Sequence, residues 1–187
     1  MYPGEAPVGR AGEAVVAVEK LALFETAVLP HLDAAYNLAR WLTRNPHDAE
    51  DLVQECMVRA FTYFDGFHGR DGRAWLLAIV RNSFYTSLRQ GRGRQTVTFE
   101  EELHSDGGPP DPETLLVRRI GAEELGKAIE ELPAAFRETL VLREIEGLSY
   151  REIADVAGVP IGTVMSRLAR ARRLVRRRLA GPPGKES

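Results

Sequence analysis

Apolar side chains recur at every third or fourth position along most of the chain, which is the spacing of one face of an α-helix. This spacing predicts a first helical stretch from Leu21 to Leu42, which Pro30 bends or divides. A second helix is predicted from about Asp48 to Phe64, and a third from about Arg73 to Arg89 after a glycine-rich turn. No strand of any length is indicated, so the sequence predicts an all-α protein.

The predicted helices of the N-terminal half carry apolar stripes that we expect to lie in a core. The stripe of the second helix consists of Ala49, Leu52, Val53, Cys56 and Ala60. In the third helix we expect burial of Trp75, Leu76 and Ile79, together with Phe84 and Leu88. These helices therefore form one packed unit.

A second helical unit is predicted in the C-terminal half. It begins near Ala122 and continues through a helix that Pro133 opens. Ser149 and Glu152 then have the spacing of a capping box, which predicts a short helix that Gly158 ends. A proline two residues later leads into another helix, so this stretch is predicted to be a helix-turn-helix.

The last predicted helix contains seven arginines between Thr163 and Ala180 and no acidic residue. Its inward apolar stripe is formed by Val164, Leu168, Ala171 and Val175. On the opposite side lie Ser166, Arg170, Arg173 and Arg177, with Arg167 on the flank. A solvated helix face usually mixes both signs of charge, whereas a purely cationic ridge fits the major groove of DNA. The pattern therefore favours DNA binding.

Composition divides the chain into five segments. Residues 1–20 are rich in glycine, proline, alanine and valine, and they predict a flexible head. Residues 95–122 are acidic and contain a Gly-Gly-Pro-Pro-Asp-Pro run, which predicts an exposed, flexible linker. The linker joins two small helical domains at 21–94 and 123–180, which we expect to be separable, and residues 181–187 form a tail.

Charge is distributed unevenly along the chain, although 25 basic and 27 acidic residues give a net charge of only −2. Residues 81–94 hold four arginines and no acid, whereas residues 95–124 hold eight acids against two arginines. Two basic zones therefore flank an acidic connector, and this distribution is compatible with nucleic-acid binding despite the negative sum.

The sequence contains no apolar run of about 18 residues and no signal peptide, so we expect a cytoplasmic protein without direct membrane insertion. Its single cysteine, Cys56, suits a reducing compartment. The four histidines are scattered and have no ligand-spaced partners, and no phosphate-binding loop is visible. We therefore expect no metal, no cofactor and no enzymatic activity.

Four motifs occur in an order and spacing that resemble one known family. They are Asp48-Ala-Glu-Asp-Leu-Val-Gln-Glu55 with the following Val58-Arg-Ala-Phe61, then Trp75-Leu-Leu-Ala-Ile-Val-Arg-Asn82, then the stretch from Leu132 to Ala154, and finally Gly162 to Arg172. With these motifs, residues 21–180 closely resemble the extracytoplasmic-function (ECF) sigma factors of bacterial RNA polymerase, which belong to the sigma-70 family. The resemblance implies that residues 21–94 are sigma domain 2 and that residues 123–180 are sigma domain 4.

The resemblance implies that an acidic surface on the second helix binds the clamp helices of the largest polymerase subunit. Its residues are Asp48, Glu50, Asp51, Gln54 and Glu55. Exposed acids would complement a basic partner, but acids near a helix N-terminus are equally compatible with capping and solubility alone.

The third helix is implied to recognise the minus-ten promoter element and to hold a base flipped from the non-template strand. The residues at the matching positions are Arg81, Asn82, Ser83, Tyr85, Thr86 and Arg89. An aromatic ring, an amide and hydroxyls beside arginines suit the capture of single-stranded DNA. Tyr85 is equally compatible with a place in the core, because it neighbours Phe84 on a helix that must bury one face.

The helix-turn-helix is implied to read the minus-35 element. The residues assigned to this surface are Arg151, Thr163, Met165, Ser166, Arg167, Ala169, Arg170 and Arg173. Arg151 and Arg173, together with the arginines at 176–178, suit phosphates better than bases. The acidic linker is implied to thread the polymerase cleft.

The sequence therefore predicts an alternative sigma factor that recognises both promoter elements and has no catalysis of its own. Its implied partners are core RNA polymerase, promoter DNA and an anti-sigma factor. The alternative is a stand-alone helix-turn-helix transcriptional regulator whose N-terminal unit dimerises or binds a signal. The segment suited to single-stranded DNA favours the sigma factor, because a repressor does not need one.

Overall fold

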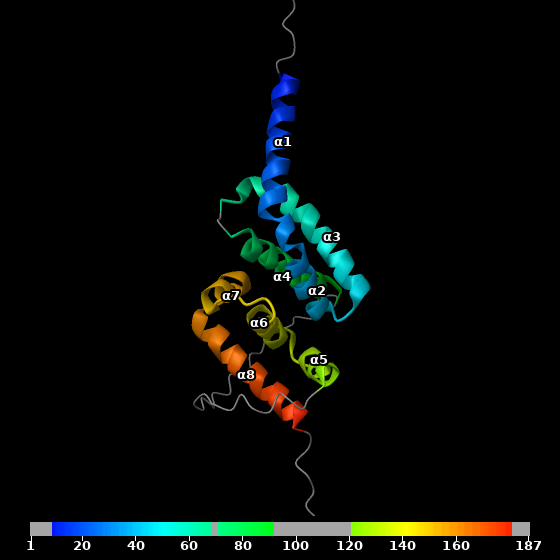
Figure 1. The fold of residues 1–187 in the computed structure, drawn as a ribbon, viewed down its shortest axis with the longest axis vertical. Helices are drawn as coiled ribbons and strands as arrows, with labels where there is room; N and C mark the ends of the chain where they lie inside the picture. The colour runs from blue at the N-terminus through cyan, green and yellow to red at the C-terminus, as the bar shows by residue number, and fades with distance from the viewer. Residues whose placement is uncertain (1–8, 69–70, 92–120, 181–187) are drawn as a thin grey trace, which may run out of the picture.

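The computed structural model describes residues 9–68, 71–91 and 121–180, and these residues form helices joined by short turns (Figure 1). The N-terminal elements are α1 (Gly9–Ala27), η1 (Leu29–His31), α2 (Leu32–Thr43), α3 (Pro46–Tyr63), η2 (Phe64–Gly66) and α4 (Gly72–Gly91). The C-terminal elements are α5 (Ala122–Glu130), α6 (Ala134–Glu144), α7 (Tyr150–Ala157) and α8 (Ile161–Leu179). The prediction of an all-α fold is confirmed for the described residues.

The N-terminal segment differs from the flexible head that composition suggested for residues 1–20. Helix α1 begins at Gly9, and Figure 1 shows it projecting away from the rest of the molecule. Alanine and glutamate are common in this segment and are good helix formers. The helix leaves Val18 and Leu23 exposed, so it lacks the amphipathic stripe by which a helix is recognised in a sequence.

Aromatic rings attach the C-terminal end of α1 to the rest of the N-terminal unit. The Phe24 ring lies edge-on to Phe61 and Phe64, with ring centroids 5.2 and 5.3 Å apart. Phe67 stacks on Phe64 and lies 4.9 Å from the Trp75 ring at the start of α4. These contacts anchor α1 to α3 and α4 before Pro30 separates it from α2, as the sequence predicted.

The core of the N-terminal unit lies between α2, α3 and α4. The expected stripe of α3 is buried, and Asn45 caps this helix by accepting a hydrogen bond from the His47 amide at 2.9 Å. In α4 the buried face is formed by Leu76, Leu77 and Val80. Leu76 was expected in the core and is buried, whereas the other expected residues of α4, which are Trp75, Ile79, Phe84 and Leu88, are half-buried.

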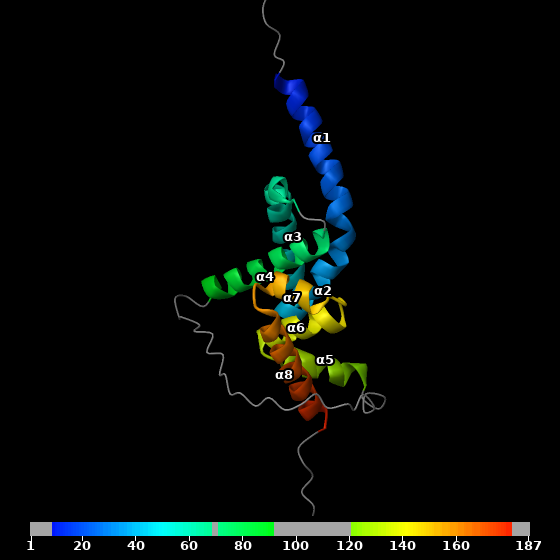
Figure 2. The same ribbon diagram turned by 90° about the vertical axis from the view of Figure 1, so that its left-hand side faces the viewer.

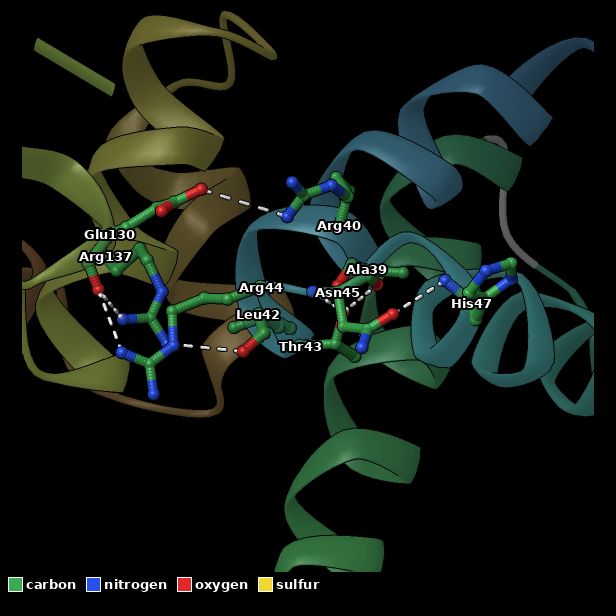
Figure 3. Close-up of polar contacts among 9 residues, drawn as sticks. All are labelled: Ala39, Arg40, Leu42, Thr43, Arg44, Asn45, His47, Glu130 and Arg137. Carbon is green, nitrogen blue, oxygen red and sulfur yellow. Dashed lines mark hydrogen bonds and ion pairs between the residues drawn. The ribbon is translucent and has the colours of Figure 1, made fainter. Parts of the chain in front are cut away.

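The two helical units, which the sequence predicted to be separable domains, pack against each other in this structure. Helix α2 lies against α6, and α4 lies against α7, as the two views of the molecule show (Figure 2). At one edge, the guanidinium of Arg137 on α6 donates to the carbonyl of Leu42 at 3.3 Å (Figure 3). Arg44 donates in turn to the carbonyl of Glu130 at 3.4 Å. These polar contacts satisfy carbonyls that helix ends leave without partners. The linker predicted at 95–122 falls almost entirely outside the described residues.

Gly72 is required where α4 begins against the end of α1. A Cβ atom at this position would lie 1.9 Å from the carbonyl oxygen of Ala27, so backbone would have to move to admit it. We predict that Gly72→Ala lowers the free energy of unfolding by about 1–3 kcal/mol, measured by urea denaturation. The matched control is Gly126→Ala in α5, where nothing lies within 4 Å of the added Cβ. The control should be neutral or stabilising by up to about 1 kcal/mol, and equal destabilisation of both variants would contradict the contact.

Candidate nucleic-acid interface

The acidic surface of α3 is fully presented to solvent. All five side chains assigned to this surface are exposed: Asp48, Glu50, Asp51, Gln54 and Glu55. Glu55 forms an ion pair at 2.6 Å with Arg59, one helical turn later, so the other carboxylates of the set dominate the charge of this surface. The stripe on the opposite side of α3 fixes this orientation by lying in the core.

A shallow groove of about 290 Å³ lies beside the acidic surface, between α2 and α3. Glu50, Val53 and Gln54 line it from α3, and α2 contributes Leu32, Asp33 and Tyr36. The α2 side of this groove was not assigned from the sequence. Leu32 is exposed at the first turn of α2, so it adds an apolar surface beside the acids of α3.

The residues assigned to minus-ten recognition do not form one exposed surface. Asn82 and Arg89 are exposed on α4, and Thr86 is half-buried. Ser83 is 5 % exposed and its hydroxyl hydrogen-bonds the buried thiol of Cys56, so its place on the DNA surface is corrected to a place in the core. A residue three positions after Val80 continues the buried face of the same helix.

Arg81 and Tyr85 of α4 point towards the C-terminal unit. Both contact Glu138 of α6, with Arg81 Nε donating at 2.7 Å and the Tyr85 hydroxyl donating at 2.8 Å. The guanidinium of Arg81 also lies 4.8 Å from the centre of the Tyr85 ring. Burial raises the pKa of Tyr85, and the Glu138 carboxylate raises it further. Burial also raises the pKa of Glu138, while Arg81 opposes this shift.

The helix-turn-helix forms as its sequence predicts. Ser149 Oγ accepts from the Glu152 amide at 3.2 Å, and Glu152 Oε2 accepts from the Ser149 amide at 2.6 Å. Gly158 ends α7 in a left-handed conformation with φ 65° and ψ 37°, which favours glycine. The four residues of the predicted stripe of α8 are all buried. This packing determines which side chains of α8 face outwards.

Most of the residues assigned to the minus-35 surface are accessible. Exposed side chains are Arg151, Met165, Ser166, Ala169 and Arg173, while Thr163 and Arg170 are half-buried. Arg167 is the exception, because it is only 8 % exposed and its Nη1 atom has no hydrogen-bond partner among the residues that the structure describes. The expected flanking position of Arg167 is therefore corrected to a place beneath the surface, near Glu138 and Tyr85.

The cationic ridge of α8 is partly neutralised within the C-terminal unit. Arg172 pairs with Glu144 at 2.6 Å, and Arg178 pairs with Glu131 at 2.6 Å. The paired acids lie on α6 and at the end of α5, on elements whose spatial relation to α8 the sequence alone does not indicate. The assignment of Arg178 to phosphate contact therefore requires that its pair with Glu131 opens.

Among the described residues, no group of histidine, cysteine, aspartate or glutamate has the arrangement of a metal site. In the same residues, no helix is both long and apolar enough to cross a membrane.

The two units correspond to two regions of one class of protein. Residues 27–94 match the family model of sigma-70 region 2, and residues 122–175 match that of sigma-70 region 4. The chain, in which the acidic helix α3 precedes α4 and a basic helix-turn-helix follows, is therefore a sigma-70 type transcription factor.

Relatives identify the family within that class. The chain is 39% identical over 159 residues to the ECF RNA polymerase sigma factor SigE of Mycolicibacterium smegmatis, covering 84% of this chain and 62% of that protein. It is 30% identical to SigW of Bacillus subtilis, over 79% of this chain and 83% of SigW. The sigma-E factor of Escherichia coli is 35% identical over 68% of this chain and 72% of its own length. The chain belongs to the ECF sigma factors.

A solved structure supports the same assignment. The sigma factor RpoE of Bartonella quintana, crystallised with the anti-sigma factor NepR, matches with a TM-score of 0.65 and 32% identity. The match covers 86% of this chain and 98% of that one. The fold of the described residues is therefore a sigma-factor fold.

Proposed function

We propose that this protein is an alternative sigma factor that binds core RNA polymerase, recognises minus-35 and minus-ten promoter elements and promotes transcription initiation. The observation that carries the proposal is the order of its surfaces along the chain, in which an exposed acidic helix and a region 2 match precede a basic region 4 helix-turn-helix. It acts without catalysis of its own, in the cytoplasm, and an anti-sigma factor is an expected partner. A stand-alone helix-turn-helix regulator, whose N-terminal unit would dimerise or bind a signal, does not need the match to sigma-70 region 2.

Two experiments test the proposal directly. The protein is used as bait in a pull-down of purified core polymerase, and transcription is then measured from a promoter whose transcripts increase when the protein is overexpressed. Capture of core polymerase and promoter-dependent transcripts would support the proposal. Tight, sequence-specific binding of duplex DNA by the free chain, without any binding of core polymerase, would favour the stand-alone regulator.

The acidic surface of α3 is proposed to contact the polymerase through Asp51 and Glu55, which are both exposed. We predict that Asp51→Lys with Glu55→Lys reduces core binding by about tenfold or more, because it places like charges against a basic partner. Folding should persist, since exposed substitutions and an i,i+4 ion pair change stability by less than about 1 kcal/mol.

The control for this reversal is Glu123→Lys with Glu124→Lys, which makes the same charge change on exposed positions of α5. It should leave core binding at the level of the parent. Equal binding by both double variants would remove α3 from the polymerase interface.

The arginines of α8 are proposed to divide between base and phosphate contacts. We predict that Arg170→Ala costs about 1–3 kcal/mol in promoter binding and relaxes preference at one base pair of the minus-35 element. Arg177 is exposed and is proposed to contact a phosphate. Arg177→Ala should weaken binding to all promoters equally, and it should reduce the slope of log affinity against log salt concentration by about one unit. Holoenzyme binding to single-base promoter variants separates the two outcomes, and identical effects of both substitutions would refute the division.

Asn82 is proposed to capture the flipped minus-ten base, because it is exposed on α4 and its amide both donates and accepts. We predict that Asn82→Ala retains core binding but loses transcription from duplex promoters, with recovery on a template mismatched across the minus-ten element. Unstacking a base costs a few kcal/mol, so capture of the base by Asn82 affects transcription only where the duplex must open. Permanganate reactivity of unpaired thymines measures the opening.

The matched control is Gln90→Ala, which removes an exposed amide near the end of the same helix. The Gln90→Ala variant should open duplex promoters to the same extent as the parent protein. An Asn82→Ala variant that opens duplex DNA equally well would show that this residue has no part in capture.

A further inference from the structure

Apolar side chains form a row on the exposed surface of α8. Ile161 is 46 % exposed and Met165 is 54 % exposed, and Ala169 is exposed one turn further along the helix. Residues four positions apart lie on the same side of a helix, so the three side chains form one ridge, which we call the apolar ridge. Single exposed apolar residues are common on protein surfaces, but a row of them on a helix rich in arginine indicates a contact with an apolar group.

Packing within the C-terminal unit keeps the apolar ridge accessible. Val164 and Leu168, which immediately precede Met165 and Ala169, are buried in the core. Because successive residues of a helix are about 100° apart, burial of the first residue of each pair turns the second away from the core. Helix α8 begins at Ile161, so the ridge occupies the first half of the helix. This is the part of a second helix that contacts base edges in helix-turn-helix proteins.

An arginine beside the apolar ridge is directed towards α6. Arg172 follows Ala169 by three positions and therefore lies on the same side of α8. Its Nε and Nη2 atoms donate to Glu144 Oε1 at 3.2 and 2.6 Å. While it is held by this carboxylate, Arg172 does not extend its guanidinium across the ridge to a base. The surface that the ridge offers is therefore apolar.

The major groove of DNA contains an apolar group that fits such a surface, which is the 5-methyl group of thymine. Adenine, guanine and cytosine are distinguished there by hydrogen-bond donors and acceptors instead. Methionine is flexible and polarizable, so its side chain adapts to a small apolar group on an irregular surface. Ser166 and Arg170, on the adjoining side of α8, suit hydrogen-bonding atoms of bases and phosphates. The helix thus presents two kinds of base contact side by side.

We propose that the apolar ridge reads thymine in the minus-35 element, and that Met165 determines this preference by contact with the thymine 5-methyl group. The inference rests on the proposed function, because it requires that α8 lies in the major groove of that element. It adds Ile161 to the residues that the sequence assigned to this surface. It also names a base that the element contains.

The test uses the holoenzyme, formed from the full chain and core polymerase, and duplex DNA of a promoter that this holoenzyme transcribes. Each thymine of the minus-35 element, on both strands, is replaced in turn by deoxyuridine. Deoxyuridine lacks the 5-methyl group and keeps the hydrogen-bonding atoms of thymine, so the replacement removes only the apolar contact. Binding of fluorescently labelled duplexes should weaken by about fourfold for at least one replacement, which corresponds to the loss of one buried methyl group.

Two variants connect this loss to the apolar ridge. Met165→Ala should bind the thymine and deoxyuridine duplexes equally, because the side chain that contacts the methyl group is absent. The control is Ile145→Ala, which shortens an apolar side chain of similar exposure, 45 %, at the end of α6. The control should keep the affinity of the parent and its discrimination between the two duplexes. Both positions are substantially exposed, and circular dichroism confirms that both variants fold.

Three outcomes would overturn the inference while leaving the proposed function intact. Equal binding of all duplexes by the parent holoenzyme would show that no thymine methyl group is contacted. Discrimination that persists in Met165→Ala would remove Met165 from the contact. Weaker binding of core polymerase by Met165→Ala, with discrimination unchanged, would assign the ridge to a protein surface. A parent chain that does not bind core polymerase in the pull-down would overturn the proposed function and this inference together.

Discussion

The arrangement of the helices depends on how the Glu138 carboxylate is compensated. A carboxylate removed from water costs several kcal/mol unless charge and hydrogen bonds replace its hydration. Here both replacing groups come from α4, at sequence separations of 57 and 53 residues. The position of α6 relative to α4 is therefore coupled to the protonation and pairing of one side chain. Removal of either partner would leave a buried group without compensation.

Apolar and polar contacts both join the two units. One apolar cluster includes Leu38, Leu76 and Val80 of the N-terminal unit and Val141, Ile153 and Leu168 of the C-terminal unit. Carboxylates, guanidinium groups and helix-end carbonyls are prominent between the units. Apolar contacts are stabilised because they remove apolar surface from water, whereas polar contacts can be exchanged for water or for another polar partner.

Local sequence patterns predicted the elements that are stabilised locally. The capping box of Ser149, the break at Gly158 and the buried stripe of α8 all follow from spacing within a single helix or turn, and they are confirmed. The stripe of α3 is confirmed for the same reason. The acidic side chains of α3 were predicted to be exposed because the opposite face must be buried, and they are.

The patterns could not reveal relations that depend on contacts between distant elements. Arg167 is buried and interacts electrostatically with Glu138 and Tyr85, and no local periodicity encodes this arrangement. The start of helix α1 before Leu21 was not predicted, because exposed apolar residues such as Val18 give this part of the helix no amphipathic stripe. In α4, Trp75 lies at the edge of the buried face. The roles of single residues in binding polymerase and DNA stay predictions, since contact with a partner is required to establish them.

The burial of Cys56 has a consequence for the signals that this protein can receive. Its thiol lies on the buried face of α3 and is hydrogen-bonded to Ser83, and burial raises its pKa. Oxidants and alkylating agents react with the thiolate, which is scarce when the pKa is raised and unreachable when the side chain is enclosed. Because Cys56 is the single cysteine of the sequence, the folded protein has no thiol with which to sense oxidative stress. A redox signal that is detected by a cysteine would therefore reach the folded chain through a binding partner.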